Sequence, residues 1–313
     1  MSRRDLPTLQ RGFASSAELH LPLYTQRMSL LQVAILAVVQ GLAELLPVSS
    51  SAHVVVAEKL MGLDPSSPPT TLLLVMLHTG TMFAVVVYFF SRWRGTYFQT
   101  MTAFKIFAWH IVLATVLTGL IGEGLVKILE QTALRGSPHA DIEDLFSHLE
   151  LIAPALALAG VLILVADIRT RRRRSLPEDD LTTGQAAIIG LVQGLSLPFR
   201  GFSRSGSTIS AGMLAGTPRL RAESFSFALA VVLTPPVVAR EMMRLVHNQT
   251  LSGLGAVAPA VFSSLLGAVL SFLAGLIALK WLSDWLEGGR WYLFGIYCLC
   301  AAAIVATLHH IGY

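Results

Sequence analysis

A polar segment at positions 40–53 carries residue types that can transfer a phosphoryl group. Gln40 and Glu44 are four residues apart, so they share one face of a helix. A carboxylate in an apolar membrane segment is costly, which makes Glu44 a candidate functional group. Pro47 can end that helix, and the serines after it can cap a second one, whose free N–H groups favour an anion.

The same segment supplies candidate nucleophiles. Ser50 offers a hydroxyl, and His53, one turn further along the short second helix, offers the side chain that exchanges protons near neutral pH. We predict that Glu44, Ser50 and His53 are catalytic and that Ser49 binds substrate. The attacking group is the Ser50 hydroxyl assisted by His53, His53 itself, or a water molecule activated by a metal. The residue types do not decide among these three.

A second polar segment at positions 198–208 has the composition of an anion cradle. Glycines let the backbone approach a ligand, hydroxyls donate hydrogen bonds, and an arginine supplies a forked cation for phosphate oxygens. We predict Arg204 to be catalytic through charge neutralisation, and we predict substrate-binding roles for the small and hydroxyl residues around it, which are Gly201, Ser203, Ser205 and Thr208.

The elements that position these residues must be membrane helices. The 313 residues are 54% apolar and 13% charged, and the mean hydropathy is +0.64, which is typical of an integral membrane protein. Backbone groups in lipid must be satisfied locally, so the long apolar runs are helices. We predict six full spans, at 71–90, 101–121, 151–166, 223–239, 254–279 and 291–309.

Each polar segment lies in a helix pair that is too short to cross a bilayer twice. The pairs are 28–46 with 50–61, and 181–198 with 205–215, so we predict two re-entrant pairs. Val39-Gln40-Gly41-Leu42 recurs as Val192-Gln193-Gly194-Leu195, and each copy precedes one pair and three spans. An odd number of spans inverts the second copy. The predicted fold is therefore an all-α polytopic membrane protein with an inverted-topology repeat.

Charge gives the domain order and the orientation. A polar tail (1–27) precedes the first repeat (28–168), and a basic linker (169–181) precedes the second repeat (182–313). Four consecutive arginines place the linker in the cytoplasm, and the acidic loop 123–150 belongs on the opposite side. The net charge is +4, but most basic residues lie in short loops between the apolar runs. This distribution indicates a membrane topology signal and not nucleic-acid binding.

These motifs resemble those of the bacitracin-resistance type undecaprenyl-diphosphate phosphatases. The first motif of that family matches Gln40, Glu44, Pro47, Ser49, Ser50 and His53, and the second matches Gly201, Ser203, Arg204, Ser205 and Thr208. Further likeness occurs at His78-Thr79-Gly80-Thr81 and at 223–227, so the resemblance covers nearly all of the chain from Met28 onwards. Gln40 occupies a position that is often Glu in the family, and Arg200 stands where Pro is usual.

The resemblance implies hydrolysis of undecaprenyl diphosphate to undecaprenyl phosphate and phosphate, which recycles the lipid carrier for cell-wall synthesis and confers bacitracin resistance. It also implies a multi-pass protein of the bacterial inner membrane with a site facing the periplasm, and a divalent cation. Hard oxygen ligands suit magnesium or calcium, held by Glu44 with Gln40. The expected partners are the lipid substrate and the membrane, and a homodimer is an open alternative.

The alternative function is a transporter or flippase that moves a lipid phosphate or a small anion without hydrolysis. Broken helices that meet at the midplane are also typical of secondary transporters. Glu44 and His53 favour chemistry, because an anion cradle alone would serve transport.

Overall fold

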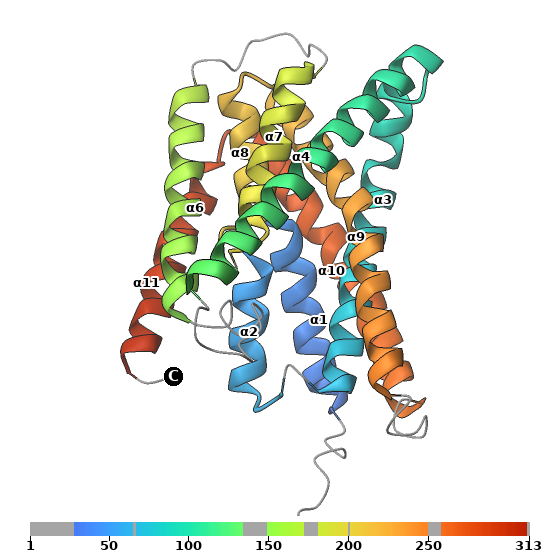
Figure 1. Cartoon of the computed structure of the whole chain (residues 1–313), viewed down its shortest axis with the longest axis vertical. Coiled ribbons are helices and arrows are strands. Elements are labelled where there is room, and N and C mark those ends of the chain that lie inside the picture. The colour runs from blue at the N-terminus through green and yellow to red at the C-terminus, as the bar shows by residue number, and fades with distance from the viewer. Residues whose placement is uncertain are drawn as a thin grey trace, which may run out of the picture.

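The computed structural model describes residues 28–64, 67–133, 149–171, 181–199, 201–249 and 258–311 (Figure 1). The tail 1–27, the central part of the acidic loop, most of the basic linker and Arg200 lie outside these ranges. The elements in the described part are all α-helices, with no β-strand. They are α1 (Leu30–Leu45), α2 (Ser50–Leu60), α3 (Pro68–Thr96), α4 (Met101–Ala133), α6 (Leu149–Thr170), α7 (Thr183–Ser196), α8 (Arg204–Leu214), α9 (Arg219–Gln249), α10 (Ala258–Glu287) and α11 (Tyr292–His310).

Six of these helices are long and apolar enough to cross a membrane, which confirms the predicted multi-pass all-α architecture. They are α3, α4, α6, α9, α10 and α11, with candidate spans of 19 to 29 residues. Two of these helices extend well beyond the spans predicted from the sequence. The helix α4 continues past position 121 to Ala133, and α9 continues to Gln249 although it contains Pro235 and Pro236.

The other four helices form two hairpins that come from opposite ends of the bundle. In Figure 1 the α1–α2 hairpin occupies the lower half of the molecule and the α7–α8 hairpin the upper half. Capping boxes begin α1 at Ser29 and α7 at Thr182. The glutamine of each box also closes the base of its hairpin, because Gln32 donates to the Met61 carbonyl at 3.4 Å and Gln185 to the Ala215 carbonyl at 3.3 Å. That these hairpins are re-entrant in a membrane stays a prediction.

The glycine of the repeated Val-Gln-Gly-Leu sequence lies at a tight helix contact in both copies. A Cβ on Gly41 would lie 2.6 Å from the Ala274 Cβ, which fixes α1 against α10. A Cβ on Gly194 would lie 2.7 Å from the Ile121 Cβ, which fixes α7 against α4. Small residues are what allow membrane helices to approach closely. The two hairpins are thus held by matching contacts, each against a span of the other half of the chain.

The helix α10 also packs against α3 and so brings α3 close to α1. Gly80 lies at the closest approach, where an added Cβ would be 2.2 Å from the Ala268 carbonyl oxygen. The buried Ser271 hydroxyl donates to the Leu77 carbonyl at 3.1 Å across the same contact. This packing positions the middle of α3 beside the end of α1.

Candidate active site

The turns of the two hairpins meet inside the bundle. The Ser205 hydroxyl at the start of α8 donates to the Leu46 carbonyl at the end of α1 at 3.3 Å. Gly206 lies close to the turn between α1 and α2, since a Cβ on Gly206 would be 3.2 Å from the Pro47 Cβ. The structure therefore brings together the two polar segments that the sequence places more than a hundred residues apart.

Both short helices begin after a residue in a strained conformation. Ser49 precedes α2 with φ 67°, and Ser203 precedes α8 with φ 40°. Positive φ is uncommon for residues other than glycine, and such strain concentrates at functional sites. The Ser203 hydroxyl accepts a hydrogen bond from the Gly206 N–H at 3.2 Å and so caps α8. These two turns set the directions in which Ser50 and Arg204 project.

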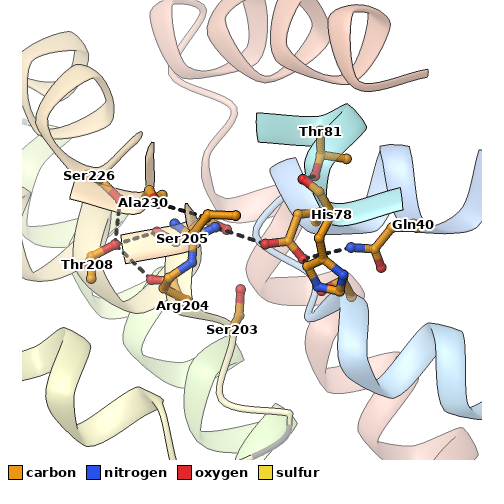
Figure 2. Close-up of polar contacts among 12 residues, drawn as sticks. Gln40, His78, Thr81, Ser203, Arg204, Ser205, Thr208, Ser226 and Ala230 are labelled. Carbon is orange, nitrogen blue, oxygen red and sulfur yellow. Dashed lines mark hydrogen bonds and ion pairs between the residues drawn. The ribbon is translucent and has the colours of Figure 1, made fainter. Parts of the chain in front are cut away.

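Glu44 is the centre of the site. Its Oε2 accepts a hydrogen bond from the Ser50 hydroxyl at 2.6 Å and another from the Gln40 amide nitrogen at 3.1 Å. Its Oε1 accepts from Nη2 of Arg204 at 3.1 Å. Figure 2 shows Arg204 and Ser205 on one side of this cluster and Gln40 and His78 on the other. The three predicted residues Glu44, Ser50 and Arg204 thus form one connected row.

Arg204 retains donor capacity that the protein does not use. The side chains of Arg204 and Glu44 are 21% and 17% exposed, so the pair is largely shielded from solvent yet reachable. Nη1 of Arg204 is buried and has no hydrogen-bond partner within the described part of the chain. An unpaired guanidinium nitrogen is costly to bury, and it matches the oxygen of a phosphate. The site therefore has the charge and the free donor that an anion requires.

His78 joins the site from α3, and we did not predict it as a site residue. Its Nδ1 donates to the Leu74 carbonyl at 2.9 Å, and its Nε2 lies 3.7 Å from Oε2 of Glu44. The side chain is 44% exposed. The available signal was a titratable residue in a charge-free predicted span, within the His-Thr-Gly-Thr likeness.

Several of the predicted substrate-binding residues also have structural contacts. The hydroxyl of Thr208 is fully buried, 2.6 Å from that of Ser226 on α9, and it donates to the Arg204 carbonyl at 2.7 Å. Gly201 has φ 107° and lies where a Cβ would be 2.6 Å from the Ile152 carbonyl oxygen. These contacts fix α8 against its neighbours. The substrate-binding roles of Ser49, Gly201, Ser203, Ser205 and Thr208 stay predictions.

The ring of His53 is held by groups outside the Glu44 cluster. Its Nδ1 lies 2.8 Å from the Ser49 carbonyl oxygen, and its Nε2 lies 2.6 Å from the Tyr297 hydroxyl of α11. Both ring nitrogens are therefore engaged in this geometry. The predicted catalytic role of His53 stays a prediction.

The residues around Glu44 fit a divalent ion only when the substrate contributes ligands. Among the described residues, no three His, Cys, Asp or Glu side chains cluster as metal ligands. Glu44 supplies one carboxylate, and Gln40 points its amide nitrogen at that carboxylate, so its amide oxygen is turned away from Glu44 in this conformation. Magnesium sites commonly combine one or two carboxylates with substrate phosphates and water. A divalent cation held by Glu44 and Gln40 stays a prediction.

The sequence matches known proteins over a range that reaches from the first hairpin to the last candidate span. A family model for the bacitracin resistance protein BacA matches residues 33–304. The protein named Undecaprenyl-diphosphatase 2 of Acinetobacter baylyi is 55% identical over 287 residues, which make up 90% of this chain and 98% of that relative. Undecaprenyl-diphosphatase 2 of Burkholderia thailandensis is 35% identical, and Undecaprenyl-diphosphatase 1 of Burkholderia pseudomallei is 34% identical, each over 88% of this chain and 95% of the relative.

Proposed function

Because the chain belongs to the bacitracin resistance protein BacA family, we propose that it hydrolyses undecaprenyl diphosphate to undecaprenyl phosphate and phosphate. It is a multi-pass membrane enzyme, and the lipid monophosphate is recycled as a carrier for cell-wall synthesis. The observation that carries this proposal is the row from Ser50 through Glu44 to Arg204. The Glu44 carboxylate is a proton acceptor that lies 2.6 Å from the Ser50 hydroxyl and 3.1 Å from the Arg204 guanidinium, which is a phosphate-binding cation.

The contacts suggest how each residue acts. The Ser50 oxygen attacks the terminal phosphorus, its proton passes to Oε2 of Glu44, and the bond to the bridging oxygen breaks to release undecaprenyl phosphate. Arg204 binds the oxygens of the transferred group and offsets their charge, which is the main requirement of phosphoryl transfer. Water then hydrolyses the phosphoserine and releases phosphate. Among the sequence-based alternatives, this choice rests on the 2.6 Å contact between Ser50 and Glu44.

A divalent cation, magnesium or calcium, would be held by Glu44 together with substrate oxygens, and Gln40 would add its amide oxygen once the amide turns over from its contact with Glu44. When bound, such an ion neutralises negative charge on the diphosphate.

The test is phosphate release from undecaprenyl diphosphate by the purified protein in detergent. We expect Ser50→Ala, Glu44→Ala and Arg204→Ala each to lose about 100-fold or more in rate. His310→Ala, an exposed histidine at the end of α11, is the matched control and should keep the wild-type rate. Near wild-type release by Glu44→Ala or Arg204→Ala would overturn the site.

The same assay separates hydrolysis from transport. A flippase would need the Arg204 cradle but not the Ser50–Glu44 pair, so a purified protein that binds the lipid and releases no phosphate would support transport. Size-exclusion chromatography with light scattering on this preparation would show whether the protein is a homodimer.

We further propose that the site faces the periplasm of the bacterial inner membrane. Support comes from the ends of α3 and α6, which carry Arg94 and Arg169 and lie at the upper end of Figure 1, opposite the α1–α2 hairpin. The test introduces a single cysteine into the Cys300→Ser protein, either Lys59→Cys or Arg94→Cys. In intact cells an impermeant maleimide should label Lys59→Cys and not Arg94→Cys. The reverse pattern would invert this topology.

A further inference from the structure

Tyr297 lies on α11, outside every motif that the sequence pattern indicated, and it contacts the first hairpin. Its hydroxyl is 2.6 Å from Nε2 of His53, and 244 residues separate the two along the chain. The rings stack, with centroids 5.7 Å apart and planes inclined by 17°. The next residue, Cys298, donates from its thiol to the Pro47 carbonyl at 3.3 Å. Consecutive residues of α11 thus hold the turn between α1 and α2.

The directions of the hydrogen bonds around His53 follow from its partners. The Ser49 carbonyl can only accept, so Nδ1 of His53 carries the proton in the 2.8 Å contact between them. In the neutral ring Nε2 is then the acceptor, and the Tyr297 hydroxyl donates to it. The Ser49 carbonyl therefore fixes the tautomer, and the hydrogen bond from Tyr297 fixes the orientation of the imidazole.

The imidazole of His53 shares the Ser49 carbonyl oxygen with a lengthened backbone hydrogen bond. In α2 the His53 N–H is 3.5 Å from the Ser49 carbonyl oxygen, which is long for a helix. In α8, where no histidine stands at the matching position, the Ser207 N–H is 2.9 Å from the Ser203 carbonyl oxygen. The imidazole therefore holds the carbonyl of Ser49, the strained residue that immediately precedes Ser50.

We propose that Tyr297, acting through His53, holds the Ser49 turn in the conformation that presents the Ser50 hydroxyl to Glu44. Tyr297 is then a positioning residue for the phosphatase reaction. His53 is a positioning residue too, because its ring supports the turn and neither accepts nor donates a proton in the chemical step. The chain of contacts runs from Tyr297 to His53, to the Ser49 carbonyl, and through the adjacent peptide to Ser50. This inference rests on the proposed role of Ser50.

The test removes the Tyr297 hydroxyl and keeps its ring. We expect Tyr297→Phe to lower kcat roughly 10- to 100-fold with KM changed less than about twofold, because misplacement of a reacting group affects the chemical step. His53→Ala should lower kcat at least as much, and the double variant should be no slower than His53→Ala alone, because both changes break one chain of contacts. Tyr292→Phe, on the same helix, is the matched control and should keep the wild-type kcat.

A thermal unfolding curve of each variant checks that the loss of rate is not a loss of fold. The proposal is overturned if Tyr297→Phe keeps the wild-type kcat, if its effect multiplies with that of His53→Ala, or if only KM rises. Ser50→Ala separates this proposal from the proposed function. An inactive Ser50→Ala beside a fully active Tyr297→Phe overturns the positioning role alone, whereas an active Ser50→Ala overturns the assignment of Ser50 and this inference with it.

Discussion

The contact between α3 and α10 at Gly80 allows a quantitative prediction for Gly80→Ala. The added Cβ would lie 2.2 Å from the Ala268 carbonyl oxygen, 3.0 Å from its carbonyl carbon and 3.2 Å from its Cα. All three are backbone atoms, so no side-chain rotation relieves the overlap. Ordinary contacts are about 3.5 Å, so the two helices must separate by roughly 1 Å. We therefore expect a loss of packing along the whole interface.

The expected magnitude combines two opposing effects. Overpacking of this kind costs about 1–3 kcal/mol, and the separation also stretches the buried hydrogen bond from Ser271 to Leu77. Alanine gains about 1 kcal/mol over glycine through helix propensity. Because backbone atoms cannot move aside, the overpacking cost lies at the upper end of this range, and we expect a net destabilisation of about 2 kcal/mol. Gly95→Ala in the same helix is the matched control, since nothing lies within 4 Å of its added Cβ.

The measurement is thermal unfolding of the two variants in detergent, followed by phosphate release. Gly80→Ala should melt below the wild type and Gly95→Ala at or slightly above it, so the two substitutions have opposite signs. Activity of Gly80→Ala should also fall, because His78 lies two residues earlier on α3 and faces Glu44. A Gly80→Ala protein that is as stable as Gly95→Ala would refute the close packing of α3 against α10.

Three further changes test other parts of the structure. Arg204→Lys keeps the charge but loses the forked donor, so kcat/KM for undecaprenyl diphosphate should fall about 100-fold in the phosphate-release assay; an unchanged value would show that charge alone suffices. Ser49→Gly relieves a positive φ of 67° and should raise stability by about 1 kcal/mol in thermal unfolding, whereas a lower melting temperature would contradict the strain. Asp167→Ala removes the buried carboxylate that contacts Arg171 and Arg219, so it should destabilise the protein by about 3 kcal/mol with no change in KM. An unaltered melting curve would show that these two ion pairs do not stabilise the fold.

Hydrophobicity and repetition predicted much of the fold. The six spans follow from apolar length, and the two hairpins follow from short polar-ended helices that repeat Val-Gln-Gly-Leu. The row of Glu44, Ser50 and Arg204 could be predicted because costly or charged groups stand out in an apolar chain. Helix ends were harder to place, because apolar length indicates where a span ends and not where its helix ends: α4 continues through the charged residues Glu123 and Lys127, which we predicted to lie in a loop, to Ala133.

The positions that sequence reasoning missed depend on how helices pack against one another. His78 and Tyr297 lie on long apolar helices outside the two polar segments, so spacing gives no indication of what they contact. Their partners are decided by the rotation and height of α3 and α11 against the first hairpin, which small residues such as Gly80 set. Similarly, the orientation of the Thr208 hydroxyl towards Ser226 depends on where α9 packs.

The pairing of Glu44 with Arg204 has a consequence for biosynthesis. Arg204 follows Glu44 by 160 residues, and a ribosome that adds about 5–20 residues per second needs on the order of 10–30 s to supply it. During this interval the nascent first half holds a carboxylate that has not yet met its cation. Tyr297 is made later still. A chain that stops before α8 would therefore leave the Glu44 carboxylate in the membrane without the cation that pairs with it.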